Sequence, residues 1–151
     1  ALGAFMDDPF YSGFLKVDPS FLKINRVLLG YPVISMGPIT HSLTQTNVTL
    51  GKPELIEKNY IEKQVTPKFP KCFIWATSND NAVDSMNSLV MAEALKKNSV
   101  PFELHLYPDG PHGGSLGDSS CYGTMAEGYF ERYGYLGDWV NQALRFIAKV
   151  M

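Results

Sequence analysis

The chain has 151 residues, of which 45% are hydrophobic and 19% are charged, and its formal net charge at pH 7 is −2. This length and composition are typical of one globular domain with a hydrophobic core. The charge provides no basic surface for nucleic acid or an anionic membrane, and no apolar run approaches the ~20 residues that a membrane-spanning helix needs.

The N-terminal segment contains aromatics and the turn formers Asp8-Pro9 and Asp18-Pro19, and residues 1–25 are predicted to be irregular. The chain does not begin with methionine, and residues 1–6 lack the basic start of a signal peptide. We therefore expect residues before Ala1 in the native protein. Only two cysteines occur, Cys72 and Cys121. Two cysteines do not make a disulfide framework, which favours a reducing, cytoplasmic setting.

The first strand is predicted over residues 26–34, a nearly continuous apolar run. Such a run suits a strand that is covered on both faces in a parallel sheet. Pro32 limits the hydrogen-bonded pairing beyond Tyr31, because proline has no N–H to donate.

Residues 37–70 are polar and are interrupted by prolines and glycines. We interpret them as an excursion outside the sheet, similar to a cap or lid, and not as a separate domain. Short helices are predicted over 53–58 and 60–65, with a proline opening the first and Asn59 capping the second.

Two more strands follow, over residues 71–77 and 101–107. The first is continuously apolar, whereas the second alternates, which indicates a half-exposed strand near a sheet edge. Between them, residues 85–97 are predicted to form an amphipathic helix with Asp84 as its N-cap.

The chain ends with a loop rich in glycine and tyrosine, residues 109–135, and a helix predicted over 136–150. The apolar side of that helix is predicted to contain Leu136, Trp139, Val140, Ala143, Leu144, Ile147 and Val150. Strands that alternate with helices predict an α/β fold with three parallel strands, flanking helices and right-handed crossovers.

A carboxylate and a histidine follow neighbouring strands of this predicted sheet. Asp80 comes three residues after the 71–77 strand, and His112 lies in a loop bounded by proline and glycine after the next strand. Because ligands collect at the carboxyl ends of parallel strands, both side chains should project from the same edge. There the carboxylate can fix the tautomer of the imidazole and stabilise its charged form. The alternative for Asp80 is an ordinary turn-forming or capping role.

Residues 71–116 resemble the C-terminal part of α/β-hydrolases of the acetyl-xylan-esterase-like group. Those enzymes have an Asp-x-x-Val segment, a helix, a strand and a Gly-x-His-Gly-type loop, which correspond here to residues 80–83 and 110–113. Residues 26–36 resemble the sixth strand of the family, and residues 2–5 resemble the end of the helix after its nucleophile. Where the family often has proline after the valine, this chain has Asp84.

The resemblance implies a serine carboxylic-ester hydrolase for short-acyl or acetylated-sugar esters, with Asp80 as the acid and His112 as the base of a triad, and with no cofactor. In the family, the Gly-x-Ser-x-Gly motif of the nucleophile and the oxyanion-hole loop precede the region that corresponds to residues 2–5, so neither is expected within these residues. We therefore expect the chain to be the C-terminal half of the fold, inactive alone, with its N-terminal half in the same polypeptide or a companion chain. The unpaired apolar edge of the 26–34 strand would also favour association between copies.

The sequence contains two other candidate nucleophiles, Ser115 and Cys121, and leaves one alternative function open. Residues 113–117 match Gly-x-Ser-x-Gly, but they follow a loop and do not open a helix, and the chain order would place Ser115 after the histidine. Cys121 lacks a strand-turn-helix setting as well. The alternative function is a non-catalytic binding or structural module, which the sequence upstream of Ala1 would distinguish from an esterase.

Overall fold

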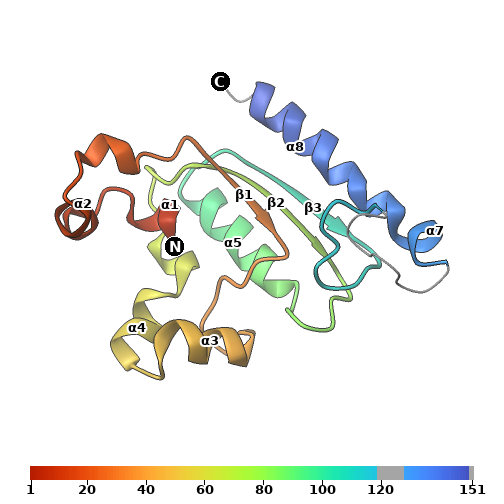
Figure 1. The fold of residues 1–151 in the computed structure, drawn as a ribbon, viewed down its shortest axis with the longest axis horizontal. Coiled ribbons are helices and arrows are strands. Elements are labelled where there is room, and N and C mark those ends of the chain that lie inside the picture. The colour runs from red at the N-terminus through yellow and green to blue at the C-terminus, as the bar shows by residue number, and fades with distance from the viewer. Residues whose placement is uncertain (119–127, 150–151) are drawn as a thin grey trace.

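Residues 1–118 and 128–149 are described by the computed structural model. They contain one sheet of three parallel strands, β1 (Arg26–Gly30), β2 (Lys71–Thr77) and β3 (Phe102–Tyr107), with β2 between the other two (Figure 1). The predicted strands and their parallel arrangement are confirmed. β1 is shorter than predicted, because the backbone turns at Tyr31, which has a φ of +39°, just before Pro32.

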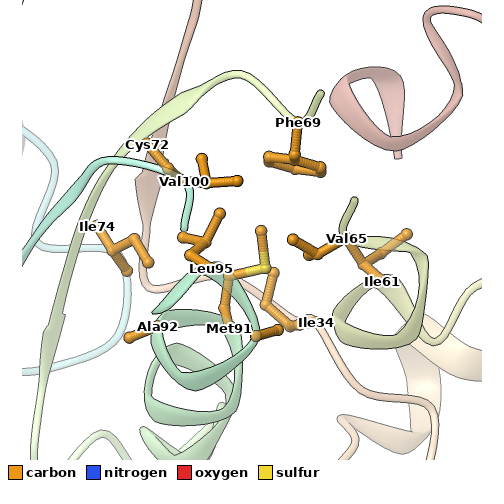
Figure 2. Packing of buried hydrophobic residues seen from close by; sticks show 11 residues of the cluster. Ile34, Ile61, Val65, Phe69, Cys72, Ile74, Met91, Ala92, Leu95 and Val100 are labelled. Carbon is orange, nitrogen blue, oxygen red and sulfur yellow. The ribbon is translucent and has the colours of Figure 1, made fainter. Parts of the chain in front are cut away.

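α5 (Met86–Lys97) covers one face of the sheet. Cys72 and Ile74 of β2 point toward it, and their core cluster includes Met91 and other apolar residues (Figure 2). Burial raises the pKa of the Cys72 thiol to about 12, so this cysteine behaves as a small hydrophobic side chain. The helix begins one residue later than predicted. Asp84 does not occupy the N-cap position, but its carboxylate accepts the N–H of Met86 at 2.8 Å.

α8 (Asp138–Lys149) covers the opposite face (Figure 1). Phe73 and Trp75 point toward it, because successive side chains of a strand project to opposite faces. The apolar stripe predicted for this helix is only partly correct. Phe146, which was not in the prediction, is buried against Phe73, whereas Leu144 is 58% exposed. Val150 lies outside the described residues.

The remaining helices are short and surround this layered core. In chain order they are α1 (Leu2–Phe5), α2 (Pro9–Leu15), the 3₁₀-helix η1 (Pro19–Leu22), α3 (Ser42–Thr49), α4 (Pro53–Lys58), the 3₁₀-helix η2 (Ile61–Gln64), α7 (Tyr129–Tyr133) and the 3₁₀-helix η3 (Gly134–Gly137).

The prediction that residues 1–25 are irregular is wrong. Asp8 and Asp18, which were interpreted as turn formers, each begin a helix with proline at its first position. Their carboxylates accept the N–H groups of Phe10 at 2.9 Å and Ser20 at 2.8 Å. An aspartate-proline pair therefore begins a helix here. The aspartate carboxylate accepts a backbone N–H of the first turn that has no partner within the helix, and the proline at the first position has no N–H that needs a partner.

The 37–70 segment contains one helix that was not predicted, α3, whose polar sequence gives little amphipathic signal. Asn59 does not cap the following helix as predicted. It ends α4, and its side chain donates to the Leu55 carbonyl oxygen at 2.9 Å. The end of the segment then enters the main core, because Ile61 and Phe69 pack in the cluster beneath α5 (Figure 2).

Asn87 of α5 forms hydrogen bonds with the backbone where the chain enters this segment. Its side chain is buried, its Oδ1 accepts the N–H groups of Ile34 and Ser35 at 2.9 and 3.0 Å, and its Nδ2 donates to the carbonyl oxygens of Ile39 and Asp84 at 2.9 Å each. All the hydrogen-bonding groups of the amide are therefore occupied.

Replacing Asn87 with leucine is expected to lower the free energy of unfolding by about 3 kcal/mol, because buried backbone groups would lose their partners. Urea unfolding followed by circular dichroism measures this change. The matched control is Asn98→Leu at the other end of α5, where only one partly buried bond, to the Ala94 carbonyl oxygen, is lost. Equal losses in the two variants would contradict the prediction.

β1 and β3 are the edge strands of the sheet within the described residues. β1 pairs only with β2, and Leu28 at its centre is 45% exposed. Two pockets lie next to β1, with volumes of about 450 Å³ and about 220 Å³. The smaller pocket is lined by Leu28, Tyr31 and Trp75 among others. No helix among the described residues has the length and apolar character to cross a bilayer.

Candidate active site

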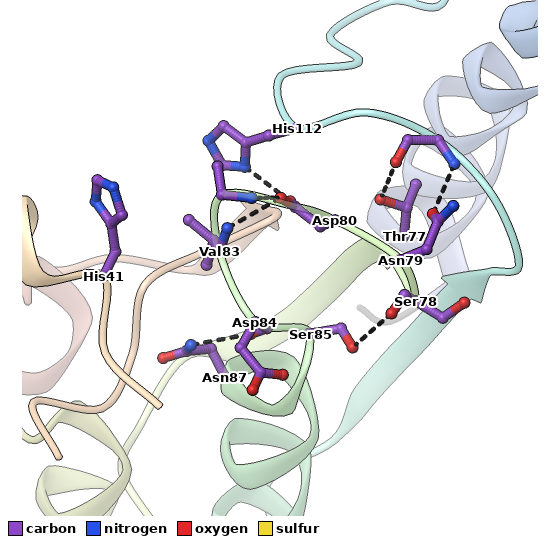
Figure 3. A network of polar contacts seen from close by, with 12 residues as sticks. His41, Thr77, Ser78, Asn79, Asp80, Val83, Asp84, Ser85, Asn87 and His112 are labelled. Atoms are coloured by element: carbon purple, nitrogen blue, oxygen red, sulfur yellow. Dashed lines mark hydrogen bonds and ion pairs between the residues drawn. The ribbon is translucent and has the colours of Figure 1, made fainter. Parts of the chain in front are cut away.

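Asp80 lies in the turn that leaves β2. Its Oδ1 accepts the backbone N–H groups of Ala82 at 2.8 Å and Val83 at 2.9 Å, and its side chain is only 1% exposed (Figure 3). Val83 is buried and anchors the end of this turn. The Asp-x-x-Val spacing thus has a physical basis, since one carboxylate oxygen is held by the backbone two and three residues later while the other stays available.

The second oxygen of Asp80 faces His112. The distance from His112 Nδ1 to Asp80 Oδ2 is 2.7 Å (Figure 3). The structure therefore brings together the two side chains that the sequence placed at neighbouring strand ends. With the carboxylate as acceptor, Nδ1 carries a proton and Nε2 has the free lone pair that a general base needs.

The surroundings of His112 leave that second nitrogen accessible. The side chain is 36% exposed, and no hydrogen bond to Nε2 is present among the described residues. The ring of Tyr31, at the end of β1, packs edge-on against the imidazole with 4.9 Å between the ring centroids. All three strand ends thus contribute to the site, and the arrangement is able to orient an imidazole and remove a proton from a hydroxyl group placed nearby.

Gly110 allows the loop that carries His112 to pass close to β2. A Cβ on this residue would lie 2.7 Å from Thr77 Cγ2 and 2.8 Å from Leu136 Cδ1, which are distances that real side chains do not adopt. The Thr77 hydroxyl donates to the Gly110 carbonyl oxygen at 2.9 Å. Glycine is therefore required two residues before His112 by the close approach of the loop to the strand.

The other two histidines have hydrogen-bond partners outside this pair. His41 begins α3, and its Nδ1 lies 2.8 Å from the Thr44 hydroxyl. His105 lies within β3, with its Nε2 2.6 Å from Glu103 Oε1. No group of three potential metal ligands is found in residues 1–118 and 128–149.

The two alternative nucleophiles gain no support. Ser115 has a φ of +43°, but it follows a loop and not a strand, and its carbonyl oxygen accepts the indole N–H of Trp139 at 2.6 Å. Cys121 lies outside the described residues. In the loop that was predicted to be rich in glycine and tyrosine, Tyr135 donates its hydroxyl proton to the carbonyl oxygen of Asp109, three residues before His112.

Three residues near the site were not predicted from the sequence. Tyr31 packs against His112, and Asn79 and Arg132 both bind Asp109 in the loop that leads to His112. The position of Tyr31 was predictable in principle, because Pro32 marks the end of the first strand and the acid and the base follow the ends of the other two strands. The position of Arg132 was not, because it lies 23 residues from its partner Asp109 in a segment without a periodic pattern.

Comparison with known proteins finds similarity in both sequence and structure. No family model matches the sequence. Over 106 residues the chain is 34% identical to endo-1,4-beta-xylanase B of Butyrivibrio fibrisolvens. The aligned region is 69% of this chain and 17% of that protein.

Solved structures match over nearly the whole chain. An acetyl ester-xyloside bifunctional hydrolase from Caldicellulosiruptor lactoaceticus has 25% identity and a TM-score of 0.65, covering 96% of this chain and 63% of that one. A carboxylesterase from Lactobacillus plantarum has 21% identity and a TM-score of 0.70, covering 97% and 52%. The chain thus spans less than two thirds of the length of these proteins. It belongs to the α/β-hydrolase superfamily and is similar to about half of the length of these esterase structures.

Proposed function

We propose that this chain supplies the acid and the base of a serine carboxylic-ester hydrolase. The observation that carries the proposal is the 2.7 Å contact between Asp80 and His112 at the ends of adjacent parallel strands, with Nε2 of the histidine unoccupied. The names of the similar solved structures, an acetyl ester-xyloside hydrolase and a carboxylesterase, support ester substrates. Short-acyl or acetylated-sugar esters are the substrate class that we propose.

In the proposed reaction, a serine oxygen attacks the carbonyl carbon of the ester while His112 Nε2 takes the serine proton. Backbone N–H groups near the serine stabilise the oxyanion of the tetrahedral intermediate. When the intermediate collapses, His112 returns the proton to the departing alcohol and an acyl-serine remains. Water then attacks the acyl-serine by the same route and releases the acid. Asp80 orients the imidazole and stabilises the imidazolium.

The serine and the oxyanion-hole donors would come from a part of the fold that these 151 residues do not contain, in the same polypeptide or a companion chain. Two observations support this proposal. The chain spans 63% and 52% of the lengths of the two solved structures, and β1 presents an open edge with Leu28 exposed. The 151 residues alone are then expected to be inactive, with the 37–70 segment acting as a cap beside the site.

The test is an assay of the full-length protein and of the isolated chain with p-nitrophenyl esters of increasing acyl length and with acetylated xylan. Turnover by the full-length protein, fastest with acetate or butyrate, and covalent labelling by a fluorophosphonate are expected. The isolated chain should show neither. If the full-length protein neither hydrolyses these esters nor reacts with the fluorophosphonate, the domain is a non-catalytic module.

A further inference from the structure

The loops that carry Asp80 and His112 are joined directly to each other before either residue is reached. Beyond the last pair of the β2–β3 ladder, the N–H of Ser78 donates to the Tyr107 carbonyl oxygen at 2.8 Å, and the Ser78 hydroxyl donates to the Pro108 carbonyl oxygen at 2.8 Å. The separation between acid and base is therefore set by contacts between these two loops as well as by the sheet.

Asn79, the residue immediately before Asp80, makes the most specific of these contacts. Its Nδ2 donates to Asp109 Oδ1 at 2.6 Å, and its Oδ1 accepts the N–H of Gly110 at 3.0 Å. Figure 3 shows its side chain reaching across to the neighbouring loop. One amide thus holds two consecutive residues of the segment that leads to His112.

Asp109 is in turn held from the opposite side by α7. Arg132 donates to Asp109 Oδ2 from Nε at 3.2 Å and from a terminal nitrogen at 2.8 Å. The Arg132 guanidinium and then the Asn79 amide lower the pKa of the Asp109 carboxyl group from its ordinary value. Each carboxylate oxygen of Asp109 has a different partner, so this side chain links the turn after β2 with the helix that precedes η3.

We propose that Asn79, Asp109 and Arg132 form a positioning clamp that holds His112 against Asp80. None of the three touches the reacting atoms of the proposed mechanism, on which this inference rests, so they act through the loop backbone. Asp109 and Arg132 are a largely exposed pair, and exposed ion pairs contribute little to stability. The clamp should therefore affect the geometry of the site much more than the stability of the fold.

The test is Asn79→Ala in the full-length protein. The kcat for p-nitrophenyl acetate is expected to fall about tenfold to a hundredfold, the loss that small misplacements of a catalytic group cause, while KM stays within about twofold by the same reasoning. The downfield NMR signal of the His112 Nδ1 proton should broaden or disappear. Arg132→Met should change kcat and this signal in the same direction, and Arg132→Lys should restore part of both.

Asn98→Ala is the matched control, since this asparagine makes only a local bond at the C-terminal end of α5. It should leave kcat and the His112 signal unchanged. The clamp is refuted if Asn79→Ala retains the wild-type kcat and His112 signal. It is also refuted if Asn98→Ala loses as much stability and as much activity as Asn79→Ala. Failure of the esterase proposal looks different: the wild-type protein would then be inactive, or its activity would not depend on His112.

Discussion

Replacing His112 with alanine in the full-length protein is expected to lower kcat/KM for p-nitrophenyl acetate by at least about 10⁴-fold. The reason is that His112 is the histidine that a buried carboxylate orients at the carboxyl ends of the strands. His41 pairs with a threonine hydroxyl before α3, and His105 lies within β3 beside Glu103. The remaining activity would come from the oxyanion hole and from substrate binding.

The matched control for this loss is His105→Ala. This histidine lies in β3, on the same strand that leads to His112, and pairs with Glu103 away from the site. Its removal should leave kcat/KM within a few-fold of the wild-type value. Thermal unfolding of both variants separates loss of catalysis from loss of fold. If His112→Ala hydrolyses the ester within a few-fold of the wild type, His112 has no part in the mechanism.

Replacing Asp80 with asparagine is expected to reduce kcat by about 10³–10⁴-fold with little change in KM, because the substitution changes the tautomer of His112. An asparagine Oδ1 can still accept the N–H groups of Ala82 and Val83, so the turn should keep its shape. Its amide N–H, however, would face His112 Nδ1 and require that nitrogen to accept. The proton then moves to Nε2, which can no longer act as a base.

The imidazole tautomer is directly measurable by ¹⁵N NMR of the histidine side chains, independently of activity. Asp84→Asn is the matched control in the same turn region, because its carboxylate only accepts the N–H of Met86 and an amide oxygen can do the same. An Asp80→Asn variant with wild-type kcat and the wild-type tautomer would remove Asp80 from the proposed triad.

The sequence predicted the central sheet and the meeting of Asp80 with His112, but not the local structure around them. Asn59 and the Asp-Pro pairs at Asp8 and Asp18 show why local motifs are less informative than buried runs. Each fits either a turn or a helix end, and the surrounding packing selects one of them. The apolar stripe of α8 failed for a related reason. Periodicity shows which residues share a side of a helix but not how much of that side a sheet will cover, and Leu144 remains exposed.

By itself, the sequence determined that three segments form parallel strands, because two of them are continuous apolar runs that suit a sheet covered on both faces and because the strands alternate with a helix. That topology places Asp80 and His112 at one edge whatever the intervening loops do. Only the tertiary structure decided that Tyr31 packs on the imidazole and that Asn79 and Arg132 hold Asp109. The same is true of the hydrogen bond from the Ile34 N–H to the side chain of Asn87 in α5. These contacts join residues that lie 23 to 81 positions apart, where the chain carries no repeating pattern and only the folded geometry determines which polar groups meet.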